Sequence, residues 1–295
     1  MDKKYTGIFS ANTTPFNEDE TLNVAGIKSE IDYMLKSGIK GFFIGGTYGE
    51  GPMMSPEEYE EYINAFSGTV NGRGTIIAQI GANSLKMTVR QAEFAEAAKV
   101  DAVAAITPTY YPHDDVSIEE YYTDLCKSTK LPVFIYNNPF RSGNKLSPSL
   151  VGKLSKIPGI YGMKDSTDSL TEFCRYKMAI NSDFNLMIGN DDMTLSAFMM
   201  GAQGGVIVLA GLFPELYVKM YEEFLKGNYE KARELQNRAI AIRMILKKGP
   251  YVSTYKAVLN LLGRPGGYSK KPIRMPSLNE IKVIEKGLKG LDFLN

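Results

Sequence analysis

The chain has 295 residues, of which 44% are hydrophobic, so it can bury a core large enough to fold without disulfides or a structural metal. Its 34 basic and 33 acidic side chains give a formal net charge of +1. Proteins that bind nucleic acids or anionic membranes usually have a strong excess of basic residues, which this chain lacks. A small neutral or anionic ligand is therefore expected, with no nucleic acid and no membrane as partner.

Eight short apolar runs follow one another along the first two thirds of the chain, and helical periodicity fills most of the gaps between them. Runs that are apolar along their whole length are typical of strands buried on both faces of a sheet. The predicted strands lie in residues 7–15, 41–46, 74–81, 102–108, 132–137, 159–165, 184–190 and 204–209. The clearest helical segments are residues 55–66, 84–99 and 117–128.

Serine residues mark several helix starts. Ser55 and Ser117 are each followed three residues later by a glutamate, Glu58 and Glu120, which predicts two capping boxes. The Ser-Pro pair at 147–148 predicts a further helix, because proline suits the first helical position.

Strands that alternate with helices predict a parallel sheet, and eight of them suggest closure into a (β/α)₈ TIM barrel. A doubly wound open sheet is the alternative, but it rarely has eight repeats, and no G-x-G-x-x-G motif follows the first run. After the eighth run, residues 213–295 have helical patterns only, one of them capped by Ser277 and Glu280. We expect an α/β protein with the barrel in residues 1–226 and a C-terminal helical extension, packed on it, in residues 227–295.

The N-terminus lacks the apolar region of a signal peptide, and no apolar run reaches eighteen residues, so a cytoplasmic protein is expected. Cys126 and Cys174 both lie in helix-like segments and are expected to be reduced, buried thiols. His113 is the only histidine, which excludes mechanisms that need a histidine cluster, and its turn-like surroundings indicate an ordinary loop residue.

One lysine has an unusual position, because the sixth predicted strand ends in Lys164 and Asp165. In a barrel, the C-terminal ends of the strands form the active-site mouth. A lysine kept from water there has a lowered pKa and can attack a carbonyl to form a Schiff base. The alternative is a barrel lysine that pairs with Asp165. Other strand ends bring phenols and a hydroxyl to the same mouth, namely Thr47, Tyr48, Tyr110, Tyr111 and Tyr136.

Motifs along nearly the whole chain carry a resemblance to a known family. They are TTPF (13–16), GTYGEG (46–51), TPTYYP (107–112), YNNP (136–139), GMKDS (162–166), GNDD (189–192) and LLGRPGG (261–267). In this order they resemble the pyruvate-dependent class I aldolases, the family of dihydrodipicolinate synthase, N-acetylneuraminate lyase and 2-keto-3-deoxygluconate aldolase. The resemblance implies a TIM-barrel enzyme that uses a lysine Schiff base and needs no metal or other cofactor.

The resemblance also implies roles for individual residues. Lys164 matches the Schiff-base lysine, and Tyr136 matches the tyrosine that moves protons to and from the substrate. Thr47 matches the hydroxyl of the proton relay. Tyr110 matches the relay tyrosine that reaches a neighbouring subunit's site, so a homo-oligomer is implied, usually a tetramer built as a dimer of dimers. The amides after Thr47 would hold the pyruvyl carboxylate.

Substrate-binding roles are expected for Tyr48, Arg141, Gly189 and Asp191. Tyr48 stands where many members have a second threonine, which narrows the pocket. Val208 replaces a serine that sialic acid lyases use, which argues against N-acetylneuraminate as substrate. The sequence most resembles the 2-keto-3-deoxy sugar acid aldolases, so reversible cleavage to pyruvate and an aldehyde is the leading prediction.

Three alternatives stay open. Arg141 occupies the place where the synthases hold the carboxylate of aspartate semialdehyde, which favours 4-hydroxy-tetrahydrodipicolinate synthase as the second candidate. A non-catalytic pyruvate-binding homologue is the third, and the retained Lys164, Tyr136, Thr47 and Tyr110 argue against it. A phosphate-binding barrel enzyme would use the glycines of residues 201–205, which are more typical of a helix-to-strand connection.

Overall fold

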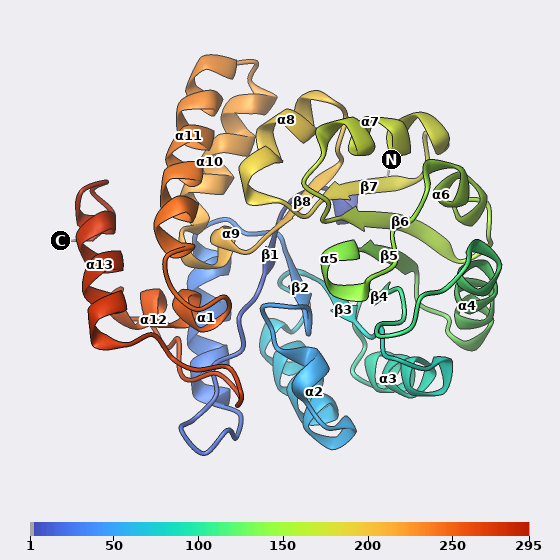
Figure 1. The fold of residues 1–295 in the computed structure, drawn as a ribbon, viewed down its shortest axis with the longest axis horizontal. Coiled ribbons are helices and arrows are strands. Elements are labelled where there is room, and N and C mark those ends of the chain that lie inside the picture. The colour runs from blue at the N-terminus through green and yellow to red at the C-terminus, as the bar shows by residue number, and fades with distance from the viewer. Residues whose placement is uncertain (1–2, 295) are drawn as a thin grey trace.

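A computed structural model describes residues 3–294, and its centre is a closed barrel of eight parallel strands in sequential order (Figure 1). The (β/α)₈ TIM barrel predicted from the sequence is confirmed. The strands are β1 (Gly7–Ala11), β2 (Gly41–Ile44), β3 (Thr75–Gln79), β4 (Ala102–Ile106), β5 (Val133–Asn137), β6 (Ile160–Asp165), β7 (Asn185–Ile188) and β8 (Gly204–Ile207). Nearly every strand residue is buried, as expected for strands covered by helices outside and by side chains inside.

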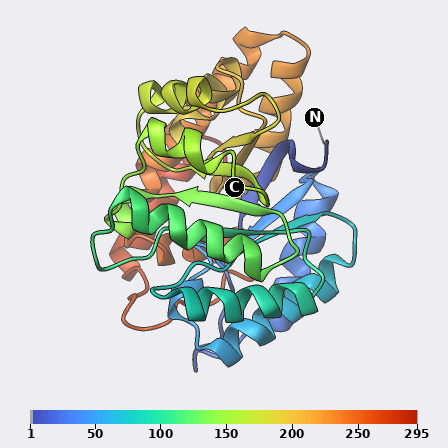
Figure 2. The ribbon, with the colours of Figure 1, turned by 90° about the vertical axis from the view of Figure 1, so that its right-hand side faces the viewer.

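Helices alternate with the strands and cover the outside of the barrel, as α3 and α4 do in the side view of Figure 2. From the N-terminus to the eighth strand they are α1 (Val24–Lys36), α2 (Pro56–Val70), α3 (Leu85–Ala97), α4 (Asp115–Ser128), α5 (Pro139–Ser142), α6 (Pro148–Leu154), α7 (Leu170–Ala179) and α8 (Thr194–Met199). Short 3₁₀ turns are η1 (Lys3–Tyr5), η2 (Gly51–Met53) and η3 (Asp191–Met193).

The predicted helix starts are confirmed with one exception. The capping boxes at Ser55 and Ser277 are both formed, and Ser147 caps α6. The box predicted at Ser117 is wrong, because α4 begins two residues earlier and is capped by Asp114, whose carboxylate accepts from the Ser117 amide. Asp114 competes successfully because an aspartate is as good an N-cap as a serine.

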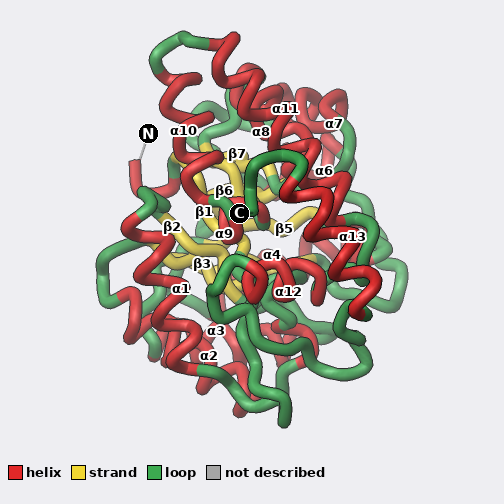
Figure 3. The backbone as a smooth tube through the Cα atoms, turned by 90° about the vertical axis from the view of Figure 1, so that its left-hand side faces the viewer, coloured by secondary structure: helices red, strands yellow, loops and turns green. Residues whose placement is uncertain are grey.

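The chain after β8 is helical, with α9 (Leu209–Leu212), α10 (Pro214–Leu225), α11 (Tyr229–Leu246), α12 (Ser253–Leu261) and α13 (Leu278–Lys289). Figure 3, which faces this side of the molecule, shows α12 and α13 on the outside of the strands. Arg264 holds the extension to α1 through an ion pair with Glu30. The division at residue 226 stays a prediction.

Two smaller expectations concern the thiols and the membrane. Cys126 and Cys174 lie in α4 and α7 as free thiols, but they are half-buried rather than buried. Burial still raises the pKa of Cys126 to about 11. Within residues 3–294, no helix is long and apolar enough to span a bilayer.

Candidate active site

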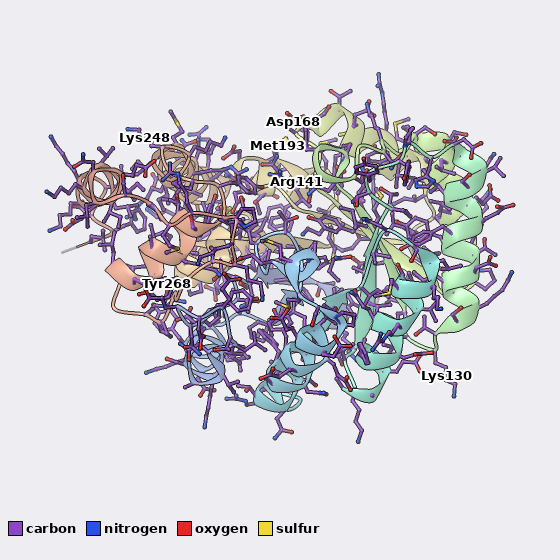
Figure 4. All side chains as sticks on the ribbon, turned by 60° about the horizontal axis from the view of Figure 1, so that its bottom comes forward. Lys130, Arg141, Asp168, Met193, Lys248 and Tyr268 are labelled. Carbon is purple, nitrogen blue, oxygen red and sulfur yellow. The ribbon has the colours of Figure 1, made fainter. Side chains whose placement is uncertain are left out.

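A cavity of about 270 Å³ opens at the C-terminal ends of the strands, where barrel chemistry is expected. Its walls combine residues that follow β2, β5, β6 and β7 with residues of the C-terminal extension. Arg141 and Asp168, both labelled in Figure 4, line its mouth. The cavity therefore unites the strand ends that the sequence singled out.

Lys164 lies at the bottom of this cavity and is 5% exposed. Its amine lies 3.9 Å from the ring centre of Phe43 and 4.2 Å from that of Tyr136. Among residues 3–294, no carboxylate lies within 4.0 Å of the amine. Burial lowers the pKa of Lys164, against the opposing effect of Tyr136. A buried amine with aromatic neighbours and no ion pair has the surroundings that favour a neutral nucleophile.

The alternative partner, Asp165, does not pair with Lys164. Successive side chains of a strand point to opposite faces, so the two residues look in opposite directions. The Asp165 carboxylate accepts from Asn137 at 2.8 Å and from the Thr167 hydroxyl at 2.8 Å. The Lys164 side chain therefore lines the cavity and makes no ion pair with Asp165.

Tyr136 lies directly beside Lys164, because the two residues are register partners on β5 and β6. Its phenol oxygen is 3.3 Å from the Thr47 hydroxyl and accepts from the Asn138 amide at 2.9 Å. Burial acts to raise the pKa of Tyr136, but the Lys164 ammonium and these hydrogen bonds outweigh it and hold the pKa below its ordinary value. Such a phenol can exchange protons with a substrate bound at Lys164.

The turn after β2 carries Thr47 and is tightly folded. A Cβ at Gly51 would lie 2.0 Å from the Gly45 carbonyl oxygen, so only glycine fits there. The Thr14 hydroxyl donates to the Gly49 carbonyl at 2.7 Å and fixes the turn from the side of β1. In the described part of the chain, the N–H groups of Tyr48 and Gly49 meet no acceptor, which leaves them available for an anion.

Tyr110 does not join this group in the single chain. Its side chain is 84% exposed and packs edge-on against Tyr111, with ring centres 4.9 Å apart. Its φ of +79° is strained for a tyrosine. Tyr110 therefore does not line the cavity of its own chain.

The remaining predicted binding residues all line the cavity. Tyr48 packs against Tyr255, with ring centres 4.7 Å apart, and against Tyr251 at 5.2 Å. The Arg141 guanidinium lies over the Tyr251 ring, 4.2 Å from its centre. This stack joins α5 to the chain segment before α12 and forms one wall.

Gly189 and Asp191 line the cavity, and each also has a structural contact; their substrate-binding roles stay predictions. A Cβ at Gly189 would lie 2.8 Å from Cε of Lys164, so this glycine makes room for the lysine. The Asp191 carboxylate is already paired with Arg243 and accepts from the Leu209 amide at 2.9 Å. Burial raises the pKa of Asp191, and Arg243 opposes that rise.

Sequence reasoning missed several lining residues, above all Arg243, Lys247 and Tyr251. They come from α11 and the segment after it, and no sequence signal placed that helix over the mouth of the barrel. Asn138 was also missed, although its place two residues after Tyr136 could have suggested it. No group of three or more His, Cys, Asp or Glu side chains suited to a metal occurs within residues 3–294.

Comparison with known proteins gives consistent results. The family model described as "Dihydrodipicolinate synthetase family" matches residues 4–290. An N-acetylneuraminate lyase of Rhizobium meliloti is 32% identical over 92% of this chain and 90% of its own length. A 4-hydroxy-tetrahydrodipicolinate synthase of Methanocaldococcus jannaschii is 30% identical over 98% of this chain and 100% of its own.

Solved structures agree with this likeness. YagE, a prophage protein of the dihydrodipicolinic acid synthase family from E. coli K12, was crystallised with pyruvate. It superposes with a TM-score of 0.94 at 25% identity, covering 98% of this chain and 99% of its own. A dihydrodipicolinate synthase structure gives 0.91 at 29% identity, covering 98% of this chain and 100% of its own.

Proposed function

Because the chain belongs to the dihydrodipicolinate synthetase family of pyruvate-dependent class I aldolases and lyases, we propose that it cleaves a 2-keto-3-deoxy sugar acid reversibly to pyruvate and an aldehyde. The observation that carries the proposal is Lys164, a buried amine without an ion pair that lies beside Tyr136 at the bottom of the cavity. That arrangement supports a Schiff base formed by Lys164.

The first half of the reaction builds an electron sink. The neutral Lys164 amine adds to the C2 carbonyl of the keto acid, and Tyr136 gives its proton to the departing hydroxyl, so that water leaves and an iminium and a Tyr136 phenolate remain. Tyr136, with its lowered pKa, takes the proton of the C4 hydroxyl. The C3–C4 bond breaks, its electron pair moves into the iminium to give an enamine, and C4 leaves as an aldehyde carbonyl.

The second half returns the enzyme to its starting state. The enamine takes a proton at C3 from Tyr136, which gives an iminium of pyruvate and a phenolate. Water then adds to C2 and returns one proton to Tyr136, and collapse of the adduct releases pyruvate and restores the neutral Lys164 amine. Overall one water is lost and one is taken up, so no oxidant, reductant or metal ion is needed to balance the reaction.

The proton relay needs a second copy of the chain in this proposal. Thr47 lies within hydrogen-bond distance of Tyr136, and the next member is Tyr110 of a neighbouring subunit. Its exposure and strained φ support that role. An apolar cavity of about 700 Å³ adjoins Thr47 and Tyr136 and offers space for an inserted aromatic side chain. We infer a homo-oligomer, and from the resemblance a tetramer built as a dimer of dimers.

Binding of the substrate divides between two ends of the cavity. The free N–H groups of Tyr48 and Gly49 suit the pyruvyl carboxylate. The tail would extend toward Arg141 and Asp168, with Lys247 beyond them. Asp191 contributes mainly by holding Arg243 in place.

A second candidate is condensation of pyruvate with aspartate semialdehyde, as in a 4-hydroxy-tetrahydrodipicolinate synthase. Arg141 favours it, since a guanidinium in the cavity wall can bind a carboxylate with two hydrogen bonds. Val208 also lines the cavity and offers no hydroxyl to a sialic acid tail.

The test is a pair of assays on the same preparation. Pyruvate release is measured with a panel of 2-keto-3-deoxy sugar acids, and condensation is measured with aspartate semialdehyde. Faster turnover of one sugar acid supports the aldolase. Efficient condensation with no release from the panel would make the synthase the better description.

A further inference from the structure

Glu50 and Lys256 form an ion pair in the interior of the protein, at the junction of the barrel and the C-terminal extension. The Glu50 residue is 1% exposed and Lys256 is 0% exposed. The Lys256 amine also donates to the Tyr268 carbonyl at 2.6 Å, and the second Glu50 oxygen accepts from the Lys270 amide at 2.7 Å. A pair this deeply buried is costly to desolvate, so stability alone does not account for it.

Glu50 is the last residue of the turn that begins at Thr47, and it has a left-handed φ of +56°. The hydrogen bonds that close the turn are long, 3.4 Å from the Glu50 amide to the Thr47 carbonyl and 3.4 Å from the Gly51 amide to the Gly46 carbonyl. Bonds of that length are weak. The position of the turn therefore depends on its side-chain anchors to the extension, which are the ion pair of Glu50 and the packing of Tyr48 against Tyr251 and Tyr255.

The relay contact is sensitive to that position. The Thr47 hydroxyl is 3.3 Å from the Tyr136 oxygen, at the long end of the hydrogen-bond range. A shift of about 1 Å would break it, and misplacements of that size can cost about 10²-fold in rate.

We propose that Glu50 and Lys256 are positioning residues, whose ion pair ties the turn of residues 47–50 to the C-terminal extension and keeps Thr47 in contact with Tyr136. The proposal rests on the proposed role of Thr47 in the relay. It gives the extension a function in catalysis, because Lys256 lies in α12 and does not itself line the cavity.

A matched control exists on the same extension. Arg264 and Glu30 form a second part-buried ion pair between the barrel and the extension, with side chains 10% and 9% exposed. Arg264 also donates to the Gly211 and Leu212 carbonyls. None of these partners belongs to the turn of residues 47–50. Removing the Arg264–Glu30 pair therefore measures the cost of losing an ion pair between barrel and extension that does not contact this turn.

The experiment is a double-mutant cycle on kcat for pyruvate release, with variants Lys256→Met, Thr47→Ala and the combination. We expect Lys256→Met to lower kcat by roughly 10- to 100-fold and the combination to be no slower than the slower single variant by more than about threefold. Costs that multiply in the combination would overturn the proposal. Arg264→Met should leave kcat within about threefold, and its effect should multiply with that of Thr47→Ala.

Two further measurements keep the outcome clear. If Lys256→Met does not fold, the variant Glu50→Gln with Lys256→Met removes both charges and is expected to fold, since an unpaired buried charge costs more than a missing pair. This doubly changed variant then replaces Lys256→Met in the double-mutant cycle with Thr47→Ala. Trapping of pyruvate by borohydride at Lys164 should persist in every folded variant. If pyruvate is not trapped at Lys164 in the unaltered protein, the proposed function itself is refuted.

Discussion

Lys164 and Tyr136 are register partners on neighbouring strands, and the Lys164 amine lies 4.2 Å from the centre of the Tyr136 ring. Each changes the protonation of the other. Tyr136 raises the pKa of Lys164 against the larger effect of burial, while Lys164 lowers the pKa of Tyr136. A base and a nucleophile coupled in this way titrate as a pair.

This coupling predicts the pH dependence of imine formation. Only the neutral amine reacts, so the rate of trapping by pyruvate and borohydride should fall at low pH as Lys164 becomes protonated. Tyr136→Phe removes the group that raises the pKa of Lys164. The low-pH midpoint of trapping should therefore move to lower pH. Tyr121→Phe, a buried tyrosine bonded to Thr88, should leave the midpoint in place, and a move to higher pH in Tyr136→Phe would contradict the coupling.

Turnover should depend on the phenol of Tyr136. Tyr136→Phe is expected to lower kcat by roughly 10² to 10⁴, the range for a positioned acid or base. The thermal midpoint of unfolding should change little, because the ring keeps its edge-on contact with Phe43. Steady-state kinetics and calorimetry on one preparation check both statements. Near-normal turnover would remove Tyr136 from the mechanism.

Tyr110 should act across a subunit interface. Tyr110→Phe is expected to reduce turnover about as much as Tyr136→Phe, whereas Tyr111→Phe, its exposed neighbour, should be close to normal. Mixed oligomers give a sharper test. In a dimer of one Tyr110→Phe chain and one Lys164→Met chain, the Lys164 of the first meets the intact Tyr110 of the second. Activity should reappear when the two inactive variants are unfolded and refolded together, and its absence would argue against a shared site.

Arg141 separates the two candidate substrates. For a keto acid with a neutral tail, Arg141→Ala should change kcat/KM by less than about tenfold, because no charge-assisted hydrogen bond is lost. For aspartate semialdehyde, the same change should cost roughly 2 to 4 kcal/mol of transition-state binding. Comparison of kcat/KM for both substrates with both proteins distinguishes them. Efficient condensation by the unaltered protein, with a kcat/KM that falls strongly in Arg141→Ala, would favour the synthase.

The barrel was predictable because each strand is a short apolar run and the turns between runs contain strong local signals. The capping residues at Ser55 and Ser277 are such signals, and both act as expected. Ser117 was misjudged because Asp114, three residues earlier, supplies an equally good cap. A local signal predicts a helix start reliably only where no competing cap stands nearby.

The site was predictable where a residue ends a strand, since all strands end at the same mouth. Lys164 and Tyr136 lie side by side for this reason. Thr47 joins them because it lies in the turn that follows β2. Arg243 and Tyr251 could not be predicted, because only the packing of the extension brings them to the cavity. The same packing pairs Asp191 with Arg243, a contact that the sequence did not predict.

The most direct measurement is mass spectrometry after incubation with pyruvate and borohydride. One reduced pyruvyl group per chain is expected, on Lys164. Lys256 provides an internal comparison, because it is also buried and its pKa is lowered to about 8, yet it is paired with Glu50 and does not line the cavity. A label on Lys164 alone would support the Schiff-base mechanism, and a label on another lysine, or none, would contradict it.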